Sequence, residues 1–513
     1  MDNKKPNIVY IFTDDMGYGD VSCLNENSKI QTDNVDRLAA EGMCFRDAHA
    51  TSSVCTPSRY SVLTGRYNWR SHLKKGIVSG YGDSLIEDGR MTVASMLQEQ
   101  GYKTACIGKW HLGWNWHKNS SKEDDVDFEK PISGGPTDAG FDYFFGISGS
   151  LDMPPYVYVE NDKVTAIPDR TTPGKKGKEV INKGLNFLRD VPDSKVTQEK
   201  AEQIFWREGA IAPDFRHEEV LPNLTEKAVS FIDQRSQDDN PFFLYFPLPA
   251  PHTPILPTER FQGKSGVNDY ADFCLQVDDV VGQIDAEIEK HGIKENTIVV
   301  FASDNGCAPM VDFKELAAYG HHPSYIFRGH KADIYEGGHR VPLIVRWPGE
   351  IPEGTTSDET VCLVDILATC ADILGVELPD NAGEDSISNL EIWRGRKPKE
   401  GLREATVHHS VNGTFSIRQG KWKLEFCPGS GGWSYPTPGT ADVDGLPSIQ
   451  LYDLEADIGE QENKQAEYPE VVQRLTELMT RYVRDGRSTP GEQQPNTGAK
   501  YWPQLNWMTE DDL

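Results

Sequence analysis

The chain lacks any continuous apolar run of membrane-spanning length, and its basic residues are few beside its acidic ones. No stretch of 18 or more apolar side chains occurs in its 513 residues, so we expect no transmembrane segment. It carries 80 Asp and Glu against 52 Lys and Arg, which gives a formal net charge of −28. Such a surface repels nucleic acid and anionic membranes at long range, which argues against nucleic acid as a partner. An anionic ligand would need a local cluster of basic side chains.

Cysteine is also scarce, and its spacing is irregular. Nine cysteines without a regular pattern do not predict a disulfide scaffold, and no CxxC pair indicates a zinc site. Residues 1–6 are polar and lead directly into an apolar run, without the pattern of a signal peptide. With 37% hydrophobic residues, the chain is nevertheless long enough for a large core and more than one domain.

Four apolar runs are typical of buried parallel strands, and each is followed by side chains that can do chemistry. The runs are residues 7–12, 103–107, 242–246 and 297–302. The polar residues that follow them are Asp14 and Asp15, then Lys109 and His111, then His252, and finally Asp304 and Asn305. Ligands of an open α/β sheet bind beyond the carboxyl ends of its strands, so we expect these side chains to converge on one site.

The remaining patterns complete the predicted architecture. Helical spacing occurs at residues 34–42, 92–100, 180–188, 203–210, 225–234 and 269–291, and a further strand is predicted at 341–347. After about residue 398 the pattern changes to short antiparallel strands, a Gly/Pro/Ser-rich segment at 429–445 that predicts a mobile loop, and a helix at 469–485. We therefore predict an α/β fold with a large, mostly parallel central sheet flanked by helices in a catalytic domain, residues 1–397. A smaller C-terminal α+β subdomain with an antiparallel sheet, residues 398–513, is expected to contribute to the substrate pocket.

A cysteine motif marks the expected start of another helix. Pro57 suits the first turn, where a missing N–H costs nothing. Cys55 would then lie at the helix N-terminus, where backbone N–H groups favour an anion, and Arg59 adds a permanent positive charge one turn later. An isolated cysteine of this kind is more often a buried, inert thiol, so the hypothesis of a reactive residue depends on the whole motif.

Residues 55–59 (CTPSR), followed by 63–66 (LTGR), resemble the signature of the type I sulfatases of the alkaline phosphatase superfamily. The segment 66–70 (RYNWR) resembles bacterial carbohydrate sulfatases more than human arylsulfatases. In this family a formylglycine-generating maturation enzyme converts the cysteine to formylglycine, an aldehyde whose hydrate is the nucleophile. The resemblance therefore implies formylglycine at Cys55 and a sulfuric ester hydrolase of the alkaline phosphatase-like fold.

Four of the residues after the strands are oxygen donors. Asp14, Asp15, Asp304 and Asn305 suit a hard divalent cation, calcium before magnesium, and the lack of a His/Cys ligand set argues against zinc. Taken alone, Asp14 and Asp15 could equally be a capped turn after a strand, and Asp304 and Asn305 followed by Gly306 are more often a turn. The resemblance implies that these four residues and the formylglycine from Cys55 bind one Ca²⁺ per chain.

The resemblance also implies roles for the basic residues. Lys109 and His111 lie in the family hallmark GKWHLG, where the lysine steadies the sulfate and the nucleophile and the histidine takes a proton from the hydrate. His252 would contact the sulfate and act as an acid, and Lys331, within residues 328–342, would contact the sulfate and could protonate the leaving oxygen. Arg59 would polarise the hydrate together with the metal.

Aromatic residues near these motifs suggest how a sugar could be held. Trp114, Trp116 and His117 directly follow GKWHLG, and Ser150 falls where some relatives place a serine that contacts sulfate. Further tryptophans, Trp433, Trp502 and Trp507, lie in C-terminal loops. Ordinary core packing is the alternative for all of the tryptophans.

The sequence hypothesis is a periplasmic or secreted sulfatase whose signal peptide has been removed. Its substrate would be a sulfated carbohydrate, with 6-O-sulfated galactose or N-acetylgalactosamine of host or algal glycans as the specific expectation, and inorganic sulfate would be released. One alternative is a phosphodiesterase or phosphonate monoester hydrolase of the same superfamily. The other is a catalytically silent protein that binds sulfated glycans.

Overall fold

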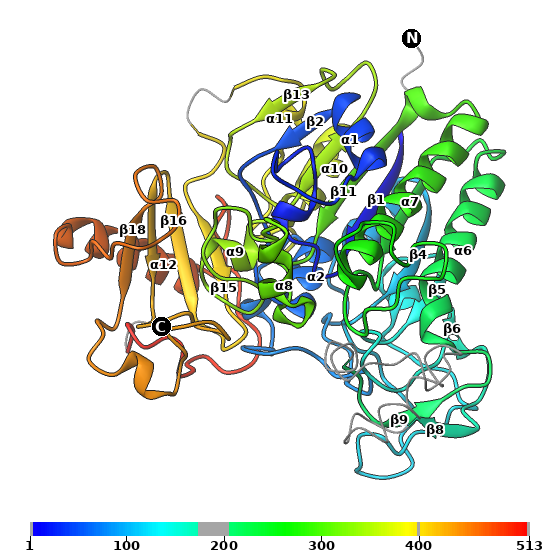
Figure 1. Cartoon of the computed structure of the whole chain (residues 1–513), viewed down its shortest axis with the longest axis horizontal. Helices are drawn as coiled ribbons and strands as arrows, with labels where there is room; N and C mark the ends of the chain where they lie inside the picture. The colour runs from blue at the N-terminus through cyan, green and yellow to red at the C-terminus, as the bar shows by residue number, and fades with distance from the viewer. Residues whose placement is uncertain (1–3, 173–204, 398–400, 510–513) are drawn as a thin grey trace.

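A computed structural model describes residues 4–172, 205–397 and 401–509. Its centre is a ten-stranded sheet, whose middle strands are blue to green in Figure 1. In sheet order the strands are β13 (Thr355–Ser357), β2 (Met43–Phe45), β12 (Leu343–Arg346), β11 (Thr297–Ser303), β1 (Asn7–Thr13), β10 (Phe242–Pro247), β4 (Lys103–Lys109), β5 (Tyr143–Ile147), β6 (Val159–Glu160) and β7 (Lys163–Val164).

The middle of this sheet is parallel and buried on both faces. β1 pairs in parallel with β10 on one side and with β11 on the other, and β4 joins β10 and β5 in the same direction. Every residue of β1, β10 and β11 is buried, which explains why their sequences read as unbroken apolar runs. The strand predicted at 341–347 is β12, and it runs antiparallel to β11. The predicted α/β class is confirmed.

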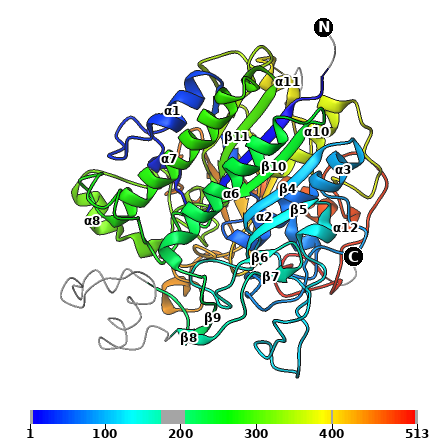
Figure 2. The same cartoon turned by 90° about the vertical axis from the view of Figure 1, so that its right-hand side faces the viewer.

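Helices cover both faces of the sheet. Figure 2 shows α6 (Val220–Arg235) and α7 (Asp269–Lys290) side by side along one face, and α1 (Asp33–Ala40) packs against α7. On the other face α10 (Ile366–Leu374) packs against α2 (Cys55–Thr64) and α3 (Val93–Glu99). α1, α3, α6 and α7 confirm four of the helices that the apolar spacing predicted.

A second, smaller sheet is built from the C-terminal part of the chain. Its order is β15 (Thr406–His409), β16 (Phe415–Gln419), β17 (Trp422–Glu425) and β18 (Gln450–Asp453), all antiparallel, and α12 (Pro469–Asp485) packs on β16 and β17. Figure 1 shows it in yellow and orange beside the large sheet. Tyr67 and Trp69, which follow α2, are buried in the same apolar cluster as Phe415 and Leu475, so the small sheet packs directly onto the N-terminal part.

One predicted helix is wrong and another falls outside the description. Residues 205–208 have no regular structure, and β9 (Gly209–Ile211) pairs with β8 (Arg170–Thr172), so the predicted helix at 203–210 is absent from its described residues. Pairing with a distant strand overrides a short local pattern of this kind. The helix predicted at 180–188 lies outside the described residues. None of the helices in the described ranges combines the length and the apolar character needed to cross a membrane.

Candidate active site

The residues that follow the parallel strands converge, as the sequence predicted. Asp14 and Asp15 follow β1, Lys109 ends β4, and Asp304 and Asn305 follow β11. The first residue of α2 is Cys55, whose Sγ lies 3.5 Å from Asp14 Oδ1. All of these side chains are buried. The structure therefore assembles one buried polar centre at the carboxyl edge of the sheet and the N-terminus of α2.

Cys55 is poorly suited to act as a thiolate. Burial raises the pKa of its thiol well above the ordinary value, although Lys109 and Lys331 oppose the shift. Its Sγ contacts Lys331 Nζ at 3.5 Å. The environment of Cys55 therefore disfavours the thiolate, which is the reactive form of cysteine.

Asp14 and Asp304 are paired with two cations. Lys109 Nζ donates to both oxygens of Asp14, at 2.9 and 2.7 Å. Arg59 donates to Asp304 Oδ2 through Nε at 3.0 Å and Nη2 at 2.6 Å, and its Nη2 lies 3.4 Å from Asp14 Oδ1. Burial alone raises the pKa of Asp14, but the surrounding cations, Lys109 first, outweigh it and hold that pKa well below its ordinary range. The buried carboxylate of Asp14 is thus kept ionised.

Asp15 is the second carboxylate of the centre. It adopts a left-handed backbone conformation, with φ of +68°, and its Oδ1 accepts from Lys331 Nζ at 2.5 Å and from Asn305 Nδ2 at 2.7 Å. Coulombic attraction to Asp15 raises the pKa of Lys331 above its ordinary value in spite of burial. Lys331, which comes from a loop far along the chain, therefore places a positive charge beside Cys55.

The donor set fits a divalent cation. Among the described residues, Asp15 Oδ2 and Asn305 Oδ1 are buried and have no hydrogen-bond partner. One ligand atom each of Asp14, Asp15, Cys55 and His252 lies within 4.8 Å of the others. Buried oxygen acceptors are rarely left unpaired, and a hard cation is the partner that such oxygens prefer.

His111 has one ring nitrogen without a partner among the described residues. Its Nε2 lies 3.0 Å from the carbonyl oxygen of Val78, which can only accept, so Nε2 carries the hydrogen and Nδ1 is the free acceptor. Nδ1 is buried and has no partner among the described residues. Burial, reinforced by Lys109 and Arg59, lowers the pKa of His111 well below its ordinary value and keeps the ring neutral.

His252 presents its other nitrogen to the centre. Its Nδ1 lies 2.6 Å from the carbonyl oxygen of Thr253 and therefore carries a hydrogen, while Nε2 lies 3.6 Å from Asp15 Oδ2. The buried Asp152 Oδ1 is 3.9 Å from Nδ1, and Arg207 pairs with the other oxygen of Asp152. Sequence reasoning missed Asp152, which follows no recognised pattern apart from lying two residues after Ser150.

The expected substrate residues are only partly near a surface. Trp114 and Trp116 are 1% and 5% exposed and pack edge to face against each other in the main core, so they do not offer a surface that could hold a sugar. The packing alternative describes them correctly. His117 is exposed, whereas Ser150 is buried with an unpartnered Oγ among the described residues.

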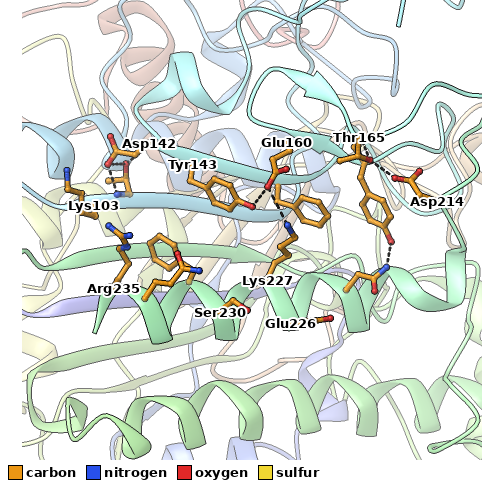
Figure 3. Close-up of a pocket in the computed structure, with 16 residues that line it drawn as sticks. Lys103, Asp142, Tyr143, Glu160, Thr165, Asp214, Glu226, Lys227, Ser230 and Arg235 are labelled. Carbon is orange, nitrogen blue, oxygen red and sulfur yellow. Dashed lines mark hydrogen bonds and ion pairs between the residues drawn. The ribbon is translucent and has the colours of Figure 1, made fainter. Parts of the chain in front are cut away.

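A large groove lies away from these residues. It encloses about 890 Å³ between α6 and strands β4 to β6, and Lys103, at the start of β4, lines one end (Figure 3). Within it Glu160 accepts from Tyr143 at 2.6 Å and from Lys227 at 3.4 Å. The groove is therefore at the opposite end of β4 from Lys109 and is separate from the buried polar centre.

The mixed sheet gathers carboxylates, cations and a helix-terminal cysteine at its carboxyl edge, a set that can bind a cation and an anion together. Comparison with known families makes this specific. The Sulfatase family model matches residues 6–376, and the model for the C-terminal region of N-sulphoglucosamine sulphohydrolase matches residues 328–433. The chain belongs to the sulfatase family and is a sulfuric ester hydrolase.

Individual relatives match over almost the whole chain. N-acetylgalactosamine-6-O-sulfatase of Bacteroides thetaiotaomicron is 35% identical over 504 residues, which cover 93% of each protein. Human arylsulfatase A is 32% identical over 492 residues, covering 93% of this chain and 87% of the relative. A solved structure described under the metabolism of multiple glycosaminoglycans by Bacteroides thetaiotaomicron superposes with a TM-score of 0.78 at 33% identity, covering 93% of this chain and 98% of the other. Sulfatases generally use formylglycine and a divalent metal.

Proposed function

We propose that the protein hydrolyses the 6-O-sulfate ester of an N-acetylgalactosamine or galactose residue in a glycan and releases inorganic sulfate. The observation that carries the reaction is the cluster of Arg59, Lys109 and Lys331 around buried Cys55, in a protein of net charge −28. Such cations bind the oxygens of a sulfate group through charge-assisted hydrogen bonds. The name of the Bacteroides thetaiotaomicron relative supports the sugar and the sulfated position.

We assign the cation site to Asp14, Asp15, Asp304, Asn305 and residue 55. Calcium is the proposed occupant, because all four side chains offer oxygen ligands and two of those oxygens are otherwise unpaired. When bound, the cation would supply Lewis-acid polarisation of the reacting oxygens. Arg59 holds Asp304 and lies beside Asp14, so it fixes the spacing of two ligands from one side.

The formylglycine form of residue 55 would supply an aldehyde hydrate as the nucleophile. In the chain itself, Lys109 and Lys331 hold positive charge next to that residue and would stabilise the negative oxygens of the sulfate during transfer. His111 Nδ1 is the free acceptor for the proton that residue 55 must lose. His252 Nε2 faces the same centre. Either the protonated form of His252, through Nε2, or Lys331 would donate a proton to the leaving alcohol.

Three further elements belong to the proposal. Maturation of Cys55 requires a formylglycine-generating enzyme as a partner. A sulfatase that acts on extracellular glycans would have to be periplasmic or secreted, and this location is part of the proposal. The C-terminal subdomain, residues 398–513, is proposed to form part of the substrate pocket, because Ser52 Oγ and Ser53 N, close to Cys55, donate to His409 O of its first strand at 2.8 and 3.0 Å.

The test measures sulfate release from N-acetylgalactosamine 6-sulfate and galactose 6-sulfate, with the 4-sulfate as the control for position. A phosphate diester and a phosphonate monoester are assayed beside them with the same calcium-supplemented, matured enzyme. Release from a 6-sulfate with a much lower rate on the other esters supports the proposal. Turnover of only the phosphorus esters, or of none, would overturn it.

A further inference from the structure

Two aromatic side chains stand exposed on one loop of the C-terminal subdomain. In this loop, residues 427–436 and called the aromatic loop below, Trp433 is 44% exposed and Tyr435 is 71% exposed. The backbone around them is covered, since Gly432 and Pro436 are buried. Trp433 and Tyr435 are thus two large aromatic side chains, two residues apart, that are available to contact a ligand.

Hydrogen bonds tie the aromatic loop to its surroundings, and the loop covers only the first part of the segment 429–445 that was predicted to be mobile. Gln450 Nε2 donates to Gly429 O at 3.0 Å, and Ser430 N donates to Pro436 O at 2.9 Å across the loop. Ile334 N donates to Ser430 O at 2.7 Å and ties the loop to the large domain. A surface fixed before binding loses little conformational entropy when a ligand arrives.

Asp333 joins the aromatic loop to the segment that carries Lys331. Its Oδ1 accepts from the backbone N–H of Trp433 at 2.8 Å and of Ser434 at 3.0 Å. Its Oδ2 accepts from His330 N at 3.0 Å. One fully buried carboxylate therefore fixes the backbone of Trp433 relative to the backbone on both sides of Lys331.

The two segments also meet backbone to backbone. A Cβ on Gly432 would lie 2.2 Å from the carbonyl oxygen of Ala332, so only glycine permits this approach. Ala332 N in turn donates to Ser53 O at 2.8 Å, two residues before Cys55. The aromatic loop therefore lies against residues 330–333, and these lie against the segment that leads to Cys55.

We propose that Trp433 and Tyr435 form a platform that stacks against a sugar ring of the substrate chain adjoining the sulfated residue. This inference rests on the proposed function. A sulfated glycan is an anion, and the acidic surface of this protein repels it outside the buried cation cluster. Contact between aromatic faces and the apolar face of a sugar needs no charge, so it supplies affinity where the surface charge opposes binding.

The kinetic test compares N-acetylgalactosamine 6-sulfate with a tetrasaccharide that ends in the same sulfated sugar. For Trp433→Ala we expect the ratio of kcat/KM on the tetrasaccharide to kcat/KM on the monosaccharide to fall about tenfold, mainly through KM, because a lost stacking contact removes ground-state binding. Trp433→Phe keeps an aromatic face and should restore most of the ratio. The matched control is Tyr468→Ala. Tyr468 is also exposed, at 37%, but it packs on Trp422 at the start of β17, so this variant should keep the wild-type ratio.

A binding measurement separates this inference from the proposed function. Calorimetry of the tetrasaccharide with Cys55→Ala and with Cys55→Ala/Trp433→Ala needs no turnover. About tenfold weaker binding by the double variant supports the platform, and equal affinity overturns it. If the wild-type enzyme releases sulfate but the kinetic ratio is unchanged in Trp433→Ala, the platform alone is refuted. If the wild-type enzyme releases no sulfate, the proposed function fails. The affinities of Cys55→Ala and Cys55→Ala/Trp433→Ala for the tetrasaccharide then still show whether Trp433 contacts the glycan.

Discussion

Replacing Trp69 by alanine should strongly destabilise the attachment of the C-terminal subdomain. Trp69 is 1% exposed, lies in the apolar cluster of the small sheet, and meets the Phe415 ring edge to face with 5.3 Å between centroids. The Arg70 guanidinium also lies 4.1 Å from the centroid of the Trp69 ring. Truncating a buried tryptophan costs about 3–5 kcal/mol. We therefore expect the free energy of unfolding to fall by about 4 kcal/mol, near the middle of that range.

The assay is urea unfolding followed by circular dichroism, with Trp433→Ala as the matched control. Trp433 is the same residue type in an exposed position, so its removal should change the free energy of unfolding by no more than about 0.5 kcal/mol. A loss below about 1 kcal/mol for Trp69→Ala would refute the argument that the segment after α2 and the small sheet share one core. Equal losses in the two variants would refute it as well.

The other predictions concern acid stability, the proton acceptor and the metal. Burial lowers the pKa of His409 to about 4 and that of His217 to about 3. Unfolded histidines bind protons below about pH 6.5, so lowering the pH from 8 to 5 should lower the free energy of unfolding by about 2 kcal/mol for each of these residues. Urea unfolding at the two pH values should show a smaller loss for His409→Phe than for the wild type. An identical pH dependence in the two proteins would refute the assignment. His111→Ala should lower kcat by about 10²–10⁴ in steady-state assays, and a loss of less than tenfold would remove its role as proton acceptor. Strong chelation should abolish turnover and calcium should restore it, whereas full activity in protein shown to be free of metal would contradict the cation site.

The parallel core could be predicted because burial on both faces leaves unbroken apolar runs. β1, β10 and β11 appear in the sequence as such runs, and the polar residues at their ends converge as the rule for open sheets requires. Lys331 has no comparable local signal. It follows a loop rather than a strand, and only the family resemblance pointed to it.

The remaining features depend on contacts that a single segment does not encode. Trp114 and Trp116 are core residues, while Trp433 is exposed, yet all three stand outside regular helices and strands. Asp152 and Asp333 act through residues far away in the sequence, respectively Arg207 and the backbone of the aromatic loop. Their partners become visible only once the chain is folded.

The most direct test of the central claim is the mass of the peptide that contains Cys55, measured on enzyme whose sulfate release is assayed in the same preparation. Conversion of the cysteine to formylglycine lowers that mass by about 18 Da. The account predicts this loss together with release of sulfate. Full sulfate release by a protein whose Cys55 is entirely unmodified would contradict it.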